Sequence, residues 1–324
     1  MSMREAILNF NEQFIYEPVI ENKDKLIACH KFIVLGMGGS HLEADLVLNW
    51  DPSQHILIRS SYALPEFHEN EIDNYLVIAS SYSGNTEEVV SGLQEAIKRN
   101  LNIAVIATGG TLINIAKENN LPYVQMPDTG IQPRSALGFS TRAILKVMNL
   151  ESGLKEIENL VGKIHLEELE LEGKRLAGLL KDHVPVVYAS DRNKAITYNW
   201  KIKFNETGKI PAFYNVFPEL NHNEMTGFDV KDSSKHLSER FKFIFIKDPA
   251  DHPKILKRME ILEKQYTDRD LPVITLSIEG ATIFEKIFRS LLIADWTAVC
   301  TADLYNLESE QVPMIEEFKK MILK

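Results

Sequence analysis

The stretch Ser80-Ser81-Tyr82-Ser83-Gly84-Asn85-Thr86-Glu87-Glu88 is the part of this sequence that says most about its fold. It follows a short apolar run, Tyr75–Ser80, and opens an amphipathic run, Thr86–Asn100. An apolar strand that leads through a polar turn into a helix is the repeating unit of parallel α/β sheets. The stretch therefore predicts such a unit.

The first half of the chain repeats this alternation on both sides of the stretch. Short runs rich in β-branched residues predict strands. The predicted strands are Phe32–Leu35, His55–Ile58, Tyr75–Ser80, Ile103–Ala107 and Tyr123–Met126. The predicted helices are His41–Asn49, Thr86–Asn100, Thr111–Asn119 and Ala136–Met148. We therefore expect a mostly parallel sheet in this half.

The second half restarts the alternation after a long amphipathic stretch. Apolar residues recur at helical spacing from Leu154 to Leu180, which predicts one long helix joining the halves. Further strands are predicted at Val184–Ala189, Phe213–Val216, Phe241–Ile246 and Val273–Leu276, and helices at Lys194–Phe204, Pro253–Gln265, Ala281–Thr301 and Pro313–Leu323. The repetition indicates a duplicated α/β architecture with domains 1–152 and 153–324.

Composition excludes several classes of protein. The chain has 324 residues, with 36 Lys and Arg against 46 Asp and Glu, so its formal net charge is −10. Such a field does not attract nucleic acid or an anionic membrane, so no partner of either kind is expected. The two cysteines, Cys29 and Cys300, form no paired motif, and no apolar stretch is long enough to cross a bilayer. We expect a cytoplasmic protein.

The hydroxyl groups of residues 80–88 indicate an anion site. Ser81, Ser83 and Thr86 can direct hydroxyls at one oxyanion, while Gly84 and the helix N-terminus supply N–H donors. This is a phosphate cradle without lysine. The alternative is ordinary helix capping by Ser83 or Asn85, which requires only one hydroxyl.

A second strand-to-helix turn, Gly36-Met37-Gly38-Gly39-Ser40, has related chemistry. It lacks the dinucleotide fingerprint, because position 41 is His41, and it lacks the GK[ST] of a P-loop. What remains is a glycine-rich turn whose amides can approach an anion at a helix N-terminus. A plain tight turn is the alternative.

Together, Gly38-Gly39-Ser40 and Ser81 through Glu88 resemble the sugar isomerase (SIS) domain, in which these two loops hold the phosphate of a phosphosugar. The segments Asn205-Glu206 and Lys209 through Glu224 resemble the bifunctional phosphoglucose/phosphomannose isomerases of archaea and bacteria. The resemblance implies an α/β fold of two SIS subdomains, each a parallel five-stranded sheet flanked by helices. It also implies a homodimer with the site near the subunit interface.

The resemblance also assigns roles to individual residues. It implies that Glu206 is the base that moves a proton between C2 and C1, that His222 opens the sugar ring from across the dimer interface, and that Lys319 assists at the ring. Arg134 would face the developing enediolate. The phosphate-binding residues would be Gly38, Gly39, Ser40, Ser81, Ser83 and Thr86. Composition alone treats Glu206, His222 and Lys319 as ordinary surface residues.

The predicted activity is interconversion of glucose 6-phosphate, mannose 6-phosphate or both with fructose 6-phosphate through an enediol, without a metal or another cofactor. No HExxH motif or comparable ligand cluster is present. Two alternatives stay open: isomerisation of a different phosphosugar, and a phosphosugar-binding SIS module without catalysis. The first is favoured by His41-Leu42-Glu43, because the family usually has small residues after the serine.

Overall fold

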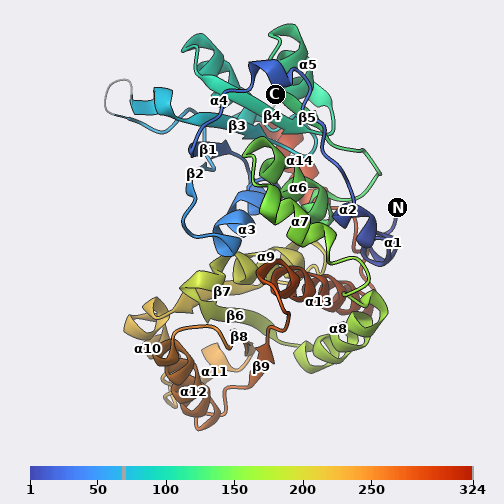
Figure 1. The fold of residues 1–324 in the computed structure, drawn as a ribbon. Coiled ribbons are helices and arrows are strands. Elements are labelled where there is room, and N and C mark those ends of the chain that lie inside the picture. The colour runs from blue at the N-terminus through green and yellow to red at the C-terminus, as the bar shows by residue number, and fades with distance from the viewer. Residues whose placement is uncertain (68–70, 323–324) are drawn as a thin grey trace. The chain divides into compact units, whose positions relative to one another are not determined.

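A computed structural model of the chain describes residues 1–67 and 71–322 (Figure 1). These residues form two compact units. The first unit runs from Leu8 to Ile164, and the second contains Ser2–Ile7 and the chain from His165 onward. Each unit is built on its own sheet of parallel strands, so the predicted α/β class is confirmed.

The first sheet has five parallel strands in the order β2-β1-β3-β4-β5. The strands are β1 (Lys31–Leu35), β2 (His55–Arg59), β3 (Leu76–Ser80), β4 (Asn102–Ala107) and β5 (Tyr123–Gln125). The chain adds β2 on one side of β1 and then returns to add β3 on the other. The loops after β1 and β3 therefore leave the same edge side by side, at the point where ligands bind in open α/β sheets.

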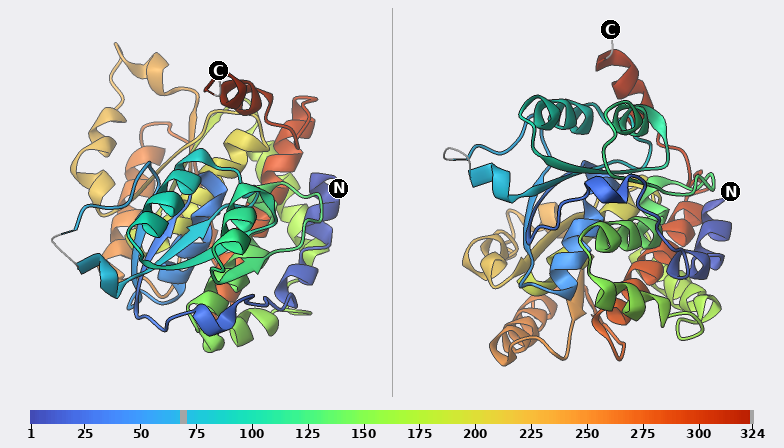
Figure 2. Two further views of the ribbon diagram at one scale, coloured as in Figure 1. Left: turned by 90° about the horizontal axis from the view of Figure 1, so that it is seen from above. Right: turned by 45° about the horizontal axis from the view of Figure 1, so that its top comes forward.

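Two layers of helices cover this sheet. Figure 2 shows α4 (Glu87–Lys98) and α5 (Gly110–Glu118) beside each other on one face. The core on this face joins Ile33, Val77 and Val105 to apolar residues of both helices. On the opposite side of the sheet, α3 (Leu42–Trp50) packs against α6 (Leu137–Val147). All predicted strands and helices of the first half are found, within a few residues at their ends.

The second sheet is parallel and has four strands in the order β7-β6-β8-β9 within the described residues. They are β6 (Val184–Ser190), β7 (Phe213–Phe217), β8 (Phe241–Lys247) and β9 (Val273–Ser277). The expected fifth strand is absent from this part of the chain. The reason is that β9 is followed after five residues by α13 (Ile283–Leu304), which leaves no apolar segment for another strand.

The predicted helix from Leu154 to Leu180 is wrong as a single element. The structure has α7 (Glu151–Glu158) and α8 (Leu166–Leu180), with a non-helical segment between them. Gly162 lies in that segment with a φ of +76°, a left-handed conformation that ends helical continuity. The apolar spacing continued across the break because both helices present a buried face to a core.

Further helices complete the two units. The first unit also contains α2 (Asn11–Phe14) and the 3-10 helices Lys23–Lys25, Gly38–Ser40, Glu71–Asn74 and Pro133–Ser135. The second contains α1 (Met3–Leu8), α9 (Lys194–Glu206), α10 (Glu224–Gly227), α11 (Lys235–Ser238), α12 (Pro253–Thr267), α14 (Pro313–Ile322) and the 3-10 helices Asp191–Asn193 and Glu219–His222. Leu323, the predicted last residue of α14, lies outside the described residues. No helix in the described chain has the length and apolar character needed to cross a bilayer.

A buried ion pair joins α9 to α13 in the second unit. Lys203 Nζ lies 2.6 Å from Asp295 Oδ1, and the two side chains are only 1% and 2% exposed. Burying either charge alone would be costly, because neither water nor a counter-ion would replace the lost solvation. The pair therefore fixes the position of α9, which ends at Glu206.

We predict that Asp295→Ala destabilises the protein by about 3–5 kcal/mol, because it leaves the Lys203 ammonium buried without its carboxylate. Urea unfolding measures this loss. The matched control is Asp303→Ala, since Asp303 pairs with Arg4 at the surface and such pairs contribute about 1 kcal/mol or less. The double variant Lys203→Met/Asp295→Leu should recover most of the stability, and failure to do so would argue against this account.

Candidate functional site

The loops after β1 and β3 meet at the switch point of the first sheet, which is the place where the order of the strands reverses. The first loop contains Gly38–Ser40, and the second runs from Ser81 to Thr86. The backbone N–H of Tyr82 donates to Ser40 Oγ at 3.0 Å, so the two loops are joined directly. The structure therefore brings together all six predicted phosphate-binding residues in one unit.

The second loop is organised by its own hydroxyls. Ser81 Oγ lies 2.7 Å from Thr86 Oγ1, and the N–H of Gly84 donates to Ser81 Oγ at 3.2 Å. Thr86 occupies the N-cap of α4 but makes no capping hydrogen bond with its side chain. Neither Ser83 nor Asn85 caps α4; instead, Asn85 Oδ1 accepts hydrogen bonds from Thr111 at the start of α5. The capping alternative is wrong here, and the N-terminus of α4 keeps donors for an anion.

Gly84 is required by the close approach of a neighbouring turn. Its φ is +70°, and a Cβ at this position would lie 1.9 Å from the carbonyl oxygen of Gly109. The same turn is tied to the loop by hydrogen bonds from Thr108 N and Oγ1 to the carbonyl oxygen of Tyr82. The turn after β4 thus supports the loop after β3.

Arg134 lies on a third segment beside the first loop. A Cβ placed on Gly39 would be 3.7 Å from the backbone of Pro133 and Arg134. The Arg134 side chain is 2% exposed, and its Nη1 donates to Gln132 Oε1 at 3.5 Å. An arginine at this depth has a fixed position, as recognition of a charged group requires.

Gln13 holds the Arg134 segment, although nothing in the sequence singled it out. It is buried in α2, donates through Nε2 to the carbonyl oxygen of Ser135 at 2.7 Å and accepts from the N–H of Gly138 at 2.9 Å. Gln13 and its partners are separated by more than 120 residues. Only the folded chain reveals this contact.

Glu43 is a fully buried carboxyl beneath the loops. It is 0% exposed, and Ser80 Oγ donates to its Oε1 at 2.5 Å. Burial raises the pKa of Glu43 to about 7, against the opposing hydrogen bond from Ser80. Nearby, His41 Nδ1 lies 2.7 Å from Asp45 Oδ2; burial opposes its charge, but this contact and the charges of Asp45 and Glu43 outweigh burial and raise the pKa of His41.

The other predicted catalytic residues belong to the second unit. Glu206 is the last residue of α9 and is partly exposed. Lys209 Nζ donates to the carbonyl oxygens of Glu206, at 2.7 Å, and of Gln311. This lysine ties the end of α9 to the segment that leads into α14. Sequence reasoning gave Lys209 no role.

His222 and Lys319 have exposed positions. His222 ends the 3-10 helix Glu219–His222 that follows β7. Lys319 lies on α14, with its side chain 63% exposed and its Nζ 2.9 Å from Glu316 Oε1. In a single chain, therefore, neither side chain is fixed by burial as Arg134 is.

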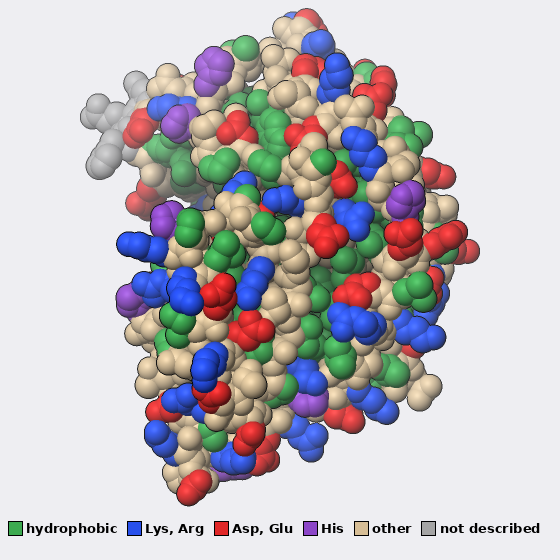
Figure 3. Space-filling view, turned by 60° about the horizontal axis from the view of Figure 1, so that its bottom comes forward, with side chains coloured by type: hydrophobic (Ala, Val, Ile, Leu, Met, Phe, Trp, Pro, Cys, Tyr) green, Lys and Arg blue, Asp and Glu red, His purple; other side chains and the backbone are tan. Residues whose placement is uncertain are grey.

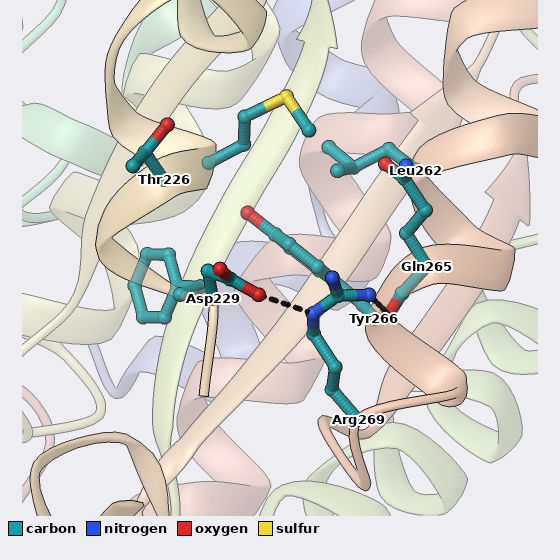
Figure 4. A pocket seen from close by; sticks show the side chains of 8 residues that line it. Thr226, Asp229, Leu262, Gln265, Tyr266 and Arg269 are labelled. Atoms are coloured by element: carbon teal, nitrogen blue, oxygen red, sulfur yellow. Dashed lines mark hydrogen bonds and ion pairs between the residues drawn. The ribbon is translucent and has the colours of Figure 1, made fainter. Parts of the chain in front are cut away.

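A cavity of about 210 Å³ opens in the second unit between α10 and α12 (Figure 4). Arg269 Nε donates to Asp229 Oδ1 at 2.9 Å on its wall. The side chain of Tyr266, labelled in the same view, extends from α12 and lines the cavity. None of the predicted site residues lines this cavity.

Neither charges of one sign on the face shown in Figure 3 nor the candidate metal ligands of the described residues form a cluster. Lys and Arg are interspersed with Asp and Glu on the face shown in Figure 3, so no patch of one sign dominates it. Within residues 1–67 and 71–322, no group of three or more His, Cys, Asp or Glu side chains is arranged to hold a metal ion.

Residues 170–322 match the family model of the bacterial phospho-glucose isomerase C-terminal SIS domain. The chain is 32% identical to the bifunctional phosphoglucose/phosphomannose isomerase of Aquifex aeolicus over 98% of both chains. It is 30% identical to the protein of that name from Caldicellulosiruptor bescii, over 90% of this chain and 89% of that one. Among solved structures, glucosamine-6-phosphate deaminase from Thermotoga maritima has the same fold, with a TM-score of 0.65 and 15% identity over 96% of each chain.

We predict that Gly84→Ala destabilises the second loop by roughly 2 kcal/mol or more, because the added methyl group meets the Gly109 carbonyl and the backbone is left-handed. Urea unfolding measures the loss. Gly162→Ala is the matched control, since its φ is also positive but nothing lies within 4 Å of the added carbon. It should cost only about 1 kcal/mol. Equal losses would contradict the role of the Gly109 contact.

We predict that Glu43→Gln stabilises the protein more at pH 8 than at pH 5. The pKa of Glu43 is raised from 4.5 to about 7, so wild-type stability falls as pH rises from about 4.5 to about 7, and an amide avoids this loss. The stability difference between variant and wild type should grow by about 2 kcal/mol between pH 5 and pH 8. Thermal unfolding at the two pH values measures it.

Glu118→Gln is the matched control for this measurement, because Glu118 is exposed at the end of α5. It should change stability equally at both pH values. If Glu43→Gln behaves like this control, the carboxyl is ionised in the folded protein across the whole range.

Proposed function

The chain belongs to the family of bifunctional phosphoglucose/phosphomannose isomerases, and from this premise we propose that it is a metal-independent enzyme acting by proton transfer through an enediol. Its substrates are glucose 6-phosphate and mannose 6-phosphate, each interconverted with fructose 6-phosphate. The single observation that carries the proposal is the cradle of hydroxyls and amides at the switch point of the first sheet. It offers neutral donors for a phosphate without a lysine.

The phosphate group anchors the substrate while the chemistry takes place at the other end of the sugar. We assign the anchor to Gly38, Gly39 and Ser40 of the first loop and to Ser81, Ser83 and Thr86 of the second. A positioned carboxylate such as that of Glu206 then removes the proton from C2 of the open-chain aldose and returns it to C1. Removal of the C2 proton leaves an enediolate, in which the proton on O2 passes to O1, and delivery of the first proton to C1 then gives the ketose.

Three further residues complete the proposed mechanism. His222 exchanges protons with the ring oxygen and the C1 hydroxyl to open the ring, since an imidazole accepts and donates protons near neutral pH. Lys319 assists at the ring. Arg134 stabilises the enediolate, because a buried guanidinium meets negative charge that develops mainly in the transition state.

The exposed position of His222 supports a site shared between two copies of the chain. A homodimer in which each copy supplies His222 to its partner's site gives this side chain a fixed environment. Cys29 and Cys300 are both free thiols, which is consistent with the reducing cytoplasm as the location of the enzyme.

We predict that the wild-type enzyme, assayed with chelator present, converts fructose 6-phosphate into both glucose 6-phosphate and mannose 6-phosphate. The reason is that every step uses a side chain of the protein as acid or base. Enzyme-coupled assays that follow each product separately measure the two activities. One product alone would restrict the specificity, and complete loss of activity with chelator would overturn the metal-independent mechanism.

Glu206→Gln should lower kcat by about 10²–10⁴, because the amide cannot accept the C2 proton. Binding of sorbitol 6-phosphate, which carries the phosphate but no carbonyl, should be retained. Glu167→Gln, a change of an exposed residue on α8, is the matched control. Turnover in Glu206→Gln equal to that of the control would exclude Glu206 as the base.

A further inference from the structure

The buried Glu43 side chain has no part in the mechanism above, although it lies directly under the proposed phosphate cradle. Its Oε1 accepts the hydrogen bond from Ser80 Oγ at 2.5 Å, and Ser80 is the last residue of β3. Its Oε2 is buried and has no hydrogen-bond partner among the described residues. A charged carboxylate buried in this way is far less favourable than a neutral one.

Two hydrogen bonds cross-link the loops on either side of Ser81. One joins Ser80 to Glu43, and the other joins the N–H of Tyr82 to Ser40 Oγ. Ser40 ends the 3-10 helix before α3, and Glu43 lies three residues later in the first turn of α3, so the same short segment contacts both neighbours of Ser81. The position of Ser81 Oγ, which bonds Thr86 Oγ1, therefore depends on both contacts.

The charges that act on Glu43 come from its own segment, namely His41 and Asp45. The exposed His55 and the partly buried Arg59 lie on β2, and Arg59 donates to the carbonyl oxygens of Tyr62 and Ala63. In α6, Arg142 donates to the carbonyl oxygens of Tyr16 and Leu154, and Lys146 pairs with Glu151. In the third segment, Arg134 donates to Gln132. None of these cations is among the charges that shift the pKa of Glu43. Burial thus dominates, and the pKa of Glu43 lies at about 7.

From this geometry we infer that Glu43 is a positioning residue of the phosphate cradle that acts in its neutral form, so that binding of a phosphorylated sugar is accompanied by proton uptake at its carboxyl. The inference rests on the proposed function, because it takes the two loops as the phosphate site. A phosphate dianion in the cradle repels the ionised carboxylate beneath it. The neutral acid keeps the contact with Ser80 and removes that repulsion.

The test is isothermal titration calorimetry of the full-length protein with sorbitol 6-phosphate at pH 7.5, in two buffers of different ionisation enthalpy. The difference between the two heats gives the number of protons taken up. We expect about half a proton or more for wild type, because most Glu43 carboxyls are ionised at this pH before binding. Glu43→Gln, which keeps an oxygen for Ser80, should take up almost none of that amount.

The same linkage has a kinetic readout. As pH rises from 6.5 to 8, the KM of wild type for fructose 6-phosphate should increase about eightfold relative to that of Glu43→Gln, since only the protonated fraction binds well. The comparison cancels the titration of the substrate phosphate, which is common to both proteins. The ratio of the kcat values should stay constant over this range.

Ser80→Ala tests the positioning role from the other side of the hydrogen bond. It leaves the carboxyl in place and should raise KM severalfold with little change in kcat, and it remains informative if a variant at Glu43 fails to fold. Unchanged KM in Ser80→Ala would overturn the positioning role. Equal proton uptake by wild type and Glu43→Gln would overturn the protonation role.

These outcomes are distinct from failure of the proposed function. Binding of sorbitol 6-phosphate with the expected difference in proton uptake, but without turnover of fructose 6-phosphate, would overturn the catalytic proposal alone. Absence of any binding would overturn both. Binding and turnover with equal proton uptake would overturn only the inference about Glu43.

Discussion

The reversal of strand order at β1 is the constraint on which the candidate site depends. Because β2 and β3 lie on opposite sides of β1, the loops after β1 and β3 leave neighbouring strands with no helix between them. The Tyr82 N–H then reaches Ser40 Oγ, and the turn after β4 supports the second loop from behind. A sheet with strands in simple sequential order would separate these two loops by a whole strand. The hydroxyl groups would then belong to separate turns.

The proposed phosphate cradle is built from neutral groups, and this explains why the net charge of the chain was uninformative about it. A phosphate held by hydroxyls, amides and a helix N-terminus needs no basic surface, so an acidic protein can provide it. The buried Arg134 is the exception, and its guanidinium donates to Gln132 of its own segment. The proposed site therefore relies on local donors and not on the net charge of the chain.

The alternation of apolar and amphipathic runs was sufficient to predict the strands, because the inner strands β1, β3 and β4 of the first sheet are buried on both faces and read as short apolar runs. The same signal failed between residues 159 and 165, since a break between two helices does not disturb the spacing of their buried residues. Gln13 and the Glu43–Ser80 pair could not be predicted. Their partners lie far away in the sequence and come close only in the folded chain. No local sequence pattern predicts that a glutamine or a glutamate is buried.

The placement of α1 changes how the chain can be divided. Ser2–Ile7 belongs to the second unit, where Arg4 pairs with Glu170 and Asp303, whereas Leu8–Ile164 forms the first unit. In topological terms the first unit is an insertion within the second, and the backbone crosses between them twice. A fragment beginning at His165 would lack a helix of its own unit. A single proteolytic cut between α7 and α8 would leave that helix attached through the first unit, so the two pieces would remain associated by contacts within the second.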